Sequence, residues 1–232
     1  MILIKLILAH LIGDFFLQPK KWITDKEKRT WTSPYLYLHS FLHFGLILLI
    51  LWDISYWTVA LFVAGSHLLI DGAKVQLQTE QTRSLWFGTD QILHLFVLVA
   101  VWMTFWSEVS VAIPGESFWI MITGIVFLTY PSSYIMMNMM NRWNEQINTE
   151  NEDSLESAGM YIGMLERIFI YTAILSGYLQ IIGFLLAAKS VFRFGDLTRA
   201  KNRKLTEYIL IGTLMSFLIA ITTGLATVRL LS

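Results

Sequence analysis

Apolar runs long enough to cross a lipid bilayer recur along this chain, and they constrain its fold more than any other feature. A helix that spans the hydrocarbon core needs about 20 predominantly apolar residues. The chain is 55% hydrophobic and only 15% charged, whereas about 25% of the residues in an ordinary soluble domain are charged. We therefore expect an all-α, polytopic helical membrane protein with about six to seven membrane helices, surrounded by the lipid bilayer.

Polar breaks between the runs predict the helix boundaries. The first run lacks a small-residue cleavage site, so we expect a retained helix rather than a removed signal peptide. A basic loop is expected after Pro19, and Pro131 is expected to kink a helix. The expected membrane helices cover residues 1–18, 35–52, 57–78, 89–106, 117–140, 158–187 and 205–230.

The helix order predicts two parts and an orientation. Residues 1–106 are expected to form a four-helix membrane bundle, and residues 107–232 a second set of membrane helices with a basic loop at 189–204. Loops rich in Lys and Arg favour the cytoplasmic side. Counting seven helices puts the two basic loops on opposite sides, so we expect one segment within 117–187 to be re-entrant or interfacial.

All five histidines lie in the expected bundle, each four residues from an aspartate or another histidine. Residues spaced by four lie on one face of a helix. The pairs occur alternately near the end and the start of consecutive helices, so an antiparallel bundle brings them to the same depth, near the cytoplasmic boundary. The eight residues are His10, Asp14, His39, His43, His67, Asp71, Asp90 and His94.

These eight residues are the predicted metal ligands. Ionisable groups inside a membrane are costly unless they are paired or bind a cation. The chain has no cysteine, so a metal must be held by nitrogen and oxygen. Among divalent metals, that donor set favours zinc, with manganese, iron or magnesium as alternatives. The negative charge of three carboxylates is enough for two divalent ions. A metal-free polar network that locks the bundle stays open as an alternative.

Three residues are predicted to act in catalysis. Asp14 or Asp90 is expected to accept a proton, and Lys74, three residues after Asp71, is expected to bind a phosphate or stabilise an oxyanion. The alternative for Lys74 is a side chain that snorkels to the membrane interface.

The motifs resemble a known family. His10-Leu-Ile-Gly-Asp14, Ser66-His67-Leu-Leu-Ile-Asp71 with Lys74, and Asp90-Gln91 with His94 are similar to the uncharacterised bacterial membrane family called domain of unknown function 3307. That resemblance implies a bacterial inner membrane and no particular activity. The second motif is also similar to membrane-bound metal-dependent hydrolases, and the first to the His-x-x-Gly-Asp of zinc-dependent nucleases and phospholipases C. The Pro-x-His of those zinc enzymes is absent here, so only the ligand pattern transfers.

Three functions are compatible with this pattern. The first is a metal-dependent hydrolase acting on a phosphate ester of a lipid or other amphiphile at the cytoplasmic face; the absence of His-Glu-x-x-His argues against a peptidase. The second is a divalent-cation transporter or channel, and the third is a structural partner protein with a metal-free polar core. The clusters of Lys and Arg fall in loops between apolar helices, so we expect no basic surface for nucleic acid. The oligomeric state stays undetermined.

Overall fold

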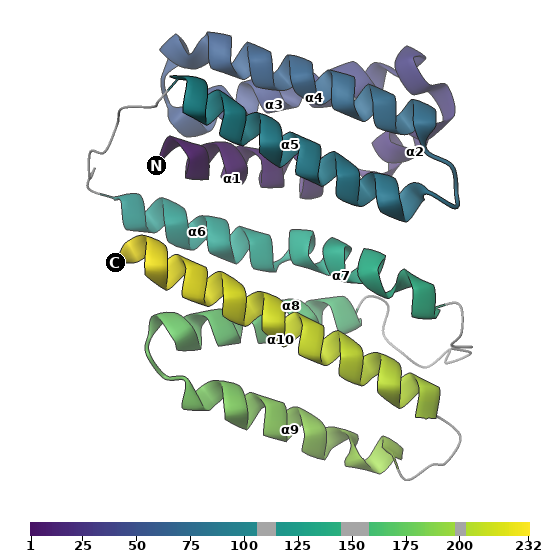
Figure 1. The fold of residues 1–232 in the computed structure, drawn as a ribbon, viewed down its shortest axis with the longest axis vertical. Helices are drawn as coiled ribbons and strands as arrows, with labels where there is room; N and C mark the ends of the chain where they lie inside the picture. Colours follow the sequence, from purple (N-terminus) through teal and green to yellow (C-terminus); the bar gives the residue numbers. More distant parts are fainter. Residues whose placement is uncertain (106–114, 145–157, 198–202) are drawn as a thin grey trace. The chain divides into compact units, whose positions relative to one another are not determined.

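The computed structural model describes residues 1–105, 115–144, 158–197 and 203–232, and within them the regular secondary structure is entirely helical (Figure 1). Six helices in these ranges are long and apolar enough to cross a membrane, and a bent helix pair over residues 2–32 could supply a seventh span. The expectation of an all-α polytopic membrane protein is confirmed. The described chain forms two compact units, Met1–Trp119 and Ile120–Ser232; the predicted boundary after residue 106 lies outside the described residues.

The first unit contains the predicted four-helix bundle, in which successive long helices run in opposite directions (Figure 1). The helices form a closed set of contacts, α1 with α3 and α5, and α4 with α3 and α5. An apolar core that includes Leu6, Ile47, Val63 and Leu98 fills the bundle on one side of the histidines. The four helices are α1 (Ile2–Phe15), α3 (Pro34–Leu51), α4 (Trp57–Leu77) and α5 (Arg83–Phe105).

The segment after Pro19 is a helix and not the predicted loop. Helix α2 (Lys20–Arg29) leaves α1 at an angle of 81° and continues into a 3-10 turn at Thr30–Thr32. Its apolar positions Trp22 and Ile23 precede Lys26 by four and three residues, so all three share one face. That face packs on α3 and α4, which explains why Lys26 is buried although its helix is strongly polar.

A glycine lets the turn after α2 pack tightly on α4. A Cβ atom added to Gly72 would overlap the Trp31 ring, and the indole Nε1 of Trp31 donates a hydrogen bond to Gln76 Oε1 at 2.5 Å. These contacts fix the end of α2 across the bundle. A second difference from the sequence prediction lies nearby, because α5 begins at Arg83 rather than at residue 89.

In the second unit, the kink predicted at Pro131 is a break between α6 (Glu116–Leu128) and α7 (Tyr130–Asn144). Proline lacks an N–H and leaves carbonyl groups without helical partners. The Arg167 guanidinium, on α8 (Ala158–Leu175), donates to the carbonyl oxygens of Leu128 and Thr129 at 2.7 and 3.2 Å. Arg167 therefore caps the broken helix. Its neighbour Glu166 accepts a hydrogen bond from Lys189 at 2.6 Å.

The single long helix predicted over residues 158–187 is two helices. Helix α8 ends at Leu175, and Gly177 two residues later has a φ of 75°, which only glycine adopts readily. The N–H groups of Gly177 and Tyr178 donate to the carbonyls of Ile174 and Ala173 at 3.1 and 2.9 Å, the bonding pattern of a Schellman motif. The chain then reverses into α9 (Gln180–Leu197), before α10 (Arg203–Leu231) returns along α8 (Figure 1).

This reversal offers a different answer to the orientation conflict. If α9 crosses the membrane by itself, the number of crossings between basic helix α2 and the basic segment 189–204 becomes even. Both basic segments are then expected on the same side of the membrane. No segment within 117–187 then needs to be interfacial. The apolar part of α9, Gln180–Val191, is shorter than the other candidate spans.

Candidate metal centre

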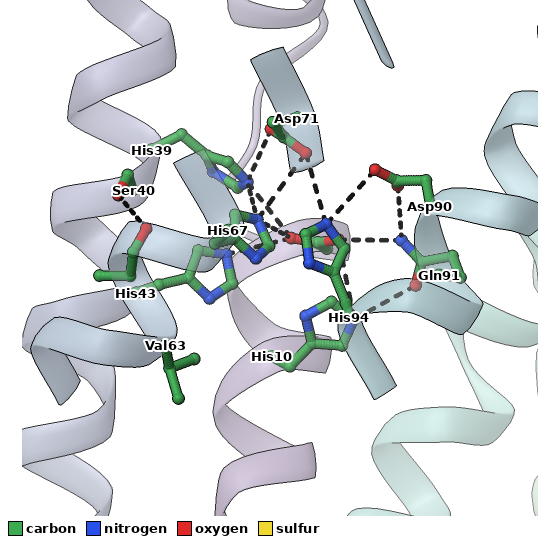
Figure 2. A network of polar contacts seen from close by, with 12 residues as sticks. His10, His39, Ser40, His43, Val63, His67, Asp71, Asp90, Gln91 and His94 are labelled. Carbon is green, nitrogen blue, oxygen red and sulfur yellow. Dashed lines mark hydrogen bonds and ion pairs between the residues drawn. The ribbon is translucent and has the colours of Figure 1, made fainter. Parts of the chain in front are cut away.

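The structure brings all eight predicted ligands into one cluster between the four helices of the bundle. Figure 2 shows the histidine side chains pointing toward one another from different helices, with Asp71 and Asp90 beside them. Each of the eight side chains is at most 8% exposed, so bulk water is largely excluded. The sequence-predicted convergence is therefore present in the fold.

One carboxylate oxygen lies at the centre of three imidazoles. Asp14 Oδ1 lies 3.0 Å from the Nε2 atom of His43, 3.2 Å from that of His39 and 3.3 Å from that of His67. A carboxylate oxygen has two lone pairs and can accept two good hydrogen bonds. Three ring nitrogens therefore surround an oxygen that can accept hydrogen bonds from only two of them. A nitrogen that does not donate to this oxygen has a lone pair that a cation could use.

A second group of ligand atoms surrounds His94. Its Nε2 atom lies 3.3 Å from Asp90 Oδ1 and 3.5 Å from Asp71 Oδ1. Both His94 Nε2 and Asp90 Oδ1 are buried, and neither has a hydrogen-bond partner among the described residues. A buried polar atom without a partner costs about 1–3 kcal/mol. These two atoms are thus available for a ligand held inside the cluster.

A glutamine connects the two groups. Gln91 Nε2 donates to Asp14 Oδ2 at 3.0 Å and to Asp90 Oδ2 at 3.2 Å. Gln91 Oε1 lies 3.3 Å from His10 Nε2 and can accept a hydrogen bond from its N–H group. The amide therefore orients two carboxylates and one imidazole, as outer partners of metal ligands do.

Two buried or half-buried lysines neutralise two of the carboxylates. Lys26 Nζ lies 2.6 Å from Asp71 Oδ2, and Lys74 Nζ lies 2.8 Å from Asp90 Oδ2. The Lys74 side chain is 23% exposed, the most accessible of these groups, whereas that of Lys26 is 5% exposed. In both pairs the lysine contacts Oδ2, and the other carboxylate oxygen, Oδ1, is the one nearest His94.

Small residues let the helices approach closely around the cluster. A Cβ atom on Gly13 would collide with the His43 ring, so glycine beside Asp14 is what allows α3 to bring His43 against α1. The hydroxyl of Ser40 donates to the carbonyl oxygen of Ala64 at 2.6 Å and ties α3 to α4.

The nitrogen and oxygen atoms of the cluster form three sets, each of which could hold one metal ion, and the sets have residues in common. Within each set, one ligand atom per residue lies within 4.8 Å of all the others. Asp14 and His67 each belong to two sets, so neighbouring ions would share ligands. The donors are nitrogen and oxygen, as zinc accepts. The sets are His10–Asp14–His43–His67, His39–His67–Asp71 and Asp14–Asp90–His94.

Sequence reasoning missed Lys26. It lies in a run of basic residues that resembles a solvated loop, and the only signal was its spacing from Trp22 and Ile23. Its ion pair with Asp71 joins residues 45 positions apart, which spacing along the chain could not reveal.

Fold and site together define a polytopic helical membrane protein with a buried histidine–aspartate cluster in its N-terminal bundle. Residues 2–119 match the family model described as protein of unknown function (DUF3307), and the chain belongs to that family. The matched range covers the whole cluster. Neither a curated protein nor a solved structure matches the chain significantly.

Proposed function

We propose that this protein is a metal-dependent membrane hydrolase that cleaves a phosphate ester of a lipid or other amphiphile. The observation that carries the proposal is the overlap of three ligand sets through Asp14 and His67, which suits two adjacent divalent ions, zinc first. Such ions would activate water and stabilise negative charge on a phosphoryl group. Lysines beside the carboxylates suit an anionic substrate.

The residues support distinct roles. Both oxygens of Asp14 are occupied by imidazoles and Gln91, which suits a ligand. Asp90 Oδ1 has no hydrogen-bond partner among the described residues, so Asp90 is the better proton acceptor. The Lys74 side chain is more exposed than that of any of the eight ligands or of Lys26, so its ammonium group is suited to bind phosphoryl oxygens of an entering substrate.

The charges around the cluster, and not its depth along the helices, favour hydrolysis over transport. Asp14 lies one residue before the end of α1, and His39 five residues after the start of α3, about 8 Å along the axis. His67 and His94, however, lie at the middle of α4 and α5, a depth that transporters also use. The lysines beside Asp71 and Asp90 suit an anionic substrate and not a pathway for cations. Since basic α2 packs on α3 and α4 and contributes Lys26 to the cluster, we propose that the site opens to the cytoplasm across a bacterial inner membrane.

The test combines metal analysis with two activity assays. The full chain would be purified in detergent without chelators, beside Asp14→Asn and the control Asp53→Asn, an exposed carboxylate in the α3–α4 turn. We expect bound transition metal and phosphate release from phosphatidic acid in mixed micelles, both lost in Asp14→Asn and kept in Asp53→Asn. Absence of metal from the wild-type protein would overturn the proposal. Zinc uptake into proteoliposomes without phosphate release would favour a transporter instead.

A further inference from the structure

The two lysines give the cluster a charge balance that limits how it can load metal. Asp14, Asp71 and Asp90 carry three negative charges, and Lys26 and Lys74 carry two positive ones. With neutral imidazoles the cluster therefore has one net negative charge. One divalent ion changes that to one net positive charge, and two ions change it to three.

Three net positive charges are not stable in a buried cluster inside a membrane unless an anion binds there too. The ligands are almost completely buried, and charge in a membrane interior is poorly solvated. Like charges a few ångströms apart repel much more strongly here than in water. The first ion and the two ammonium groups therefore oppose the second ion, although the ligand sets have room for it.

The lysines are placed to bind the missing anion. Lys26 and Lys74 each donate one hydrogen bond to a carboxylate, whereas an ammonium group has three N–H donors. They reach the cluster from different elements, α2 and α4, and bind the two carboxylates, Asp71 and Asp90, whose other oxygens face His94. An anion bound by these ammonium groups would thus adjoin the carboxylates and imidazole that form the ligand sets.

We propose that Lys26 and Lys74 make the binding of a second divalent cation depend on a dianion of the phosphate-monoester class, whose oxygens the two ammonium groups bind. The inference rests on the proposed metal site. It deepens the proposed function because it selects phosphate monoesters over diesters: a monoester carries two negative charges, and a diester carries one.

Equilibrium dialysis of the full chain in detergent against buffered Zn²⁺ tests this without measuring activity. The probes are methylphosphonate, at a pH where it is a dianion, and methanesulfonate, a monoanion of similar shape. We expect one zinc per wild-type chain alone or with methanesulfonate, and two with methylphosphonate. The dianion should raise the affinity for the second zinc at least about tenfold.

Variants separate charge from structure. Lys74→Met should bind the second zinc without methylphosphonate, and Lys74→Arg, which keeps the charge, should still need it. Lys26→Met should behave as Lys74→Met does. The control is Lys189→Met, which removes a lysine paired with Glu166 in the second unit and should leave zinc binding unchanged.

The outcomes distinguish the two proposals. Two zinc ions in the wild-type protein without methylphosphonate, or one zinc ion under every condition, would overturn the inference and leave the proposed hydrolase standing. Failure of the wild-type protein to bind any zinc would overturn the metal site itself.

Discussion

The Nε2 atoms of His39 and His67 face each other at 3.1 Å, from neighbouring helices. A neutral imidazole has one N–H group and one lone pair, so one of these nitrogens donates and the other accepts. His67 Nε2 also lies 3.3 Å from Asp14 Oδ1, and its ring stacks on that of His94 with centroids 3.8 Å apart. His67 therefore connects His39, Asp14 and His94 to one another.

Two histidines of the cluster should differ in their importance for metal binding. His67 belongs to two ligand sets, and His43 to one. We expect His67→Ala to weaken the affinity for the first and for the second zinc ion at least about 100-fold. Loss of a residue that only hydrogen-bonds to a metal ligand typically costs about 10–100-fold. His43→Ala should preserve binding through His39, His67 and Asp71. Dialysis against zinc measures both; equal losses in the two variants would contradict the shared-ligand geometry.

Gly13→Ala should damage the site without removing a ligand. Its Cβ would collide with the His43 ring, and overpacking of this kind costs about 1–3 kcal/mol. We expect a lower thermal unfolding temperature. We also expect weaker zinc binding, because separating α1 from α3 displaces Asp14, which belongs to two ligand sets. Gly45→Ala is the matched control, since its Cβ meets no atom within 4 Å and alanine is favoured in helices. A normal zinc affinity in Gly13→Ala would show that His43 can move freely.

Gly72→Ala should detach α2 from the bundle. The added methyl group would occupy the space of the Trp31 ring, and the Lys26–Asp71 ion pair depends on the same docking. We expect faster amide hydrogen exchange in α2, measured by mass spectrometry, while α3 and α5 stay protected. Gly65→Ala on the same helix, where the Cβ meets nothing within 4 Å, should leave exchange unchanged. Unchanged exchange in Gly72→Ala would mean that Trp31 does not hold α2.

Arg167→Met should destabilise the second unit alone. Arg167 is 2% exposed and donates to Leu128 O, Thr129 O and the hydroxyl of Ser133. Its removal takes the Arg167 hydrogen bond away from Leu128 O, while Thr129 O keeps its bonds from the N–H and hydroxyl of Ser133. An unpaired buried carbonyl costs about 1–3 kcal/mol, so the unfolding temperature should fall. Zinc binding in the first unit should persist.

Glu166→Gln is the control for Arg167→Met. Glu166 is the neighbouring residue and its ion pair with Lys189 is partly exposed, so its loss should cost at most about 1 kcal/mol. If both variants lost equal stability, capping of the α6 end would not be the role of Arg167.

Much of the candidate site was predictable because helical spacing is regular. Residues four apart share a helix face, and short connections make neighbouring helices antiparallel. The pairs from His10–Asp14 to Asp90–His94 could therefore be assigned to one depth from their positions along the chain. The same rule predicted the bundle, since apolar runs of membrane length leave few alternatives to helices.

The errors arose where tertiary contacts outweigh local composition. The polar segment of α2 has the composition of a loop, yet Trp22, Ile23 and Lys26 give it one face that packs on the bundle. The run 158–187 is apolar enough throughout to suggest one helix, but Gly177 ends it with a left-handed turn that reverses the chain.

The sequence by itself determined the membrane class, the bundle and the convergence of five histidines and three aspartates, because these follow from helical periodicity and the insolubility of apolar runs. Only the tertiary structure decided which oxygen meets which nitrogen, that Lys26 pairs with Asp71, and that Asp14 and His67 are shared between ligand sets. Such relations depend on the rotation and close approach of helices distant in sequence, and no spacing along the chain encodes them.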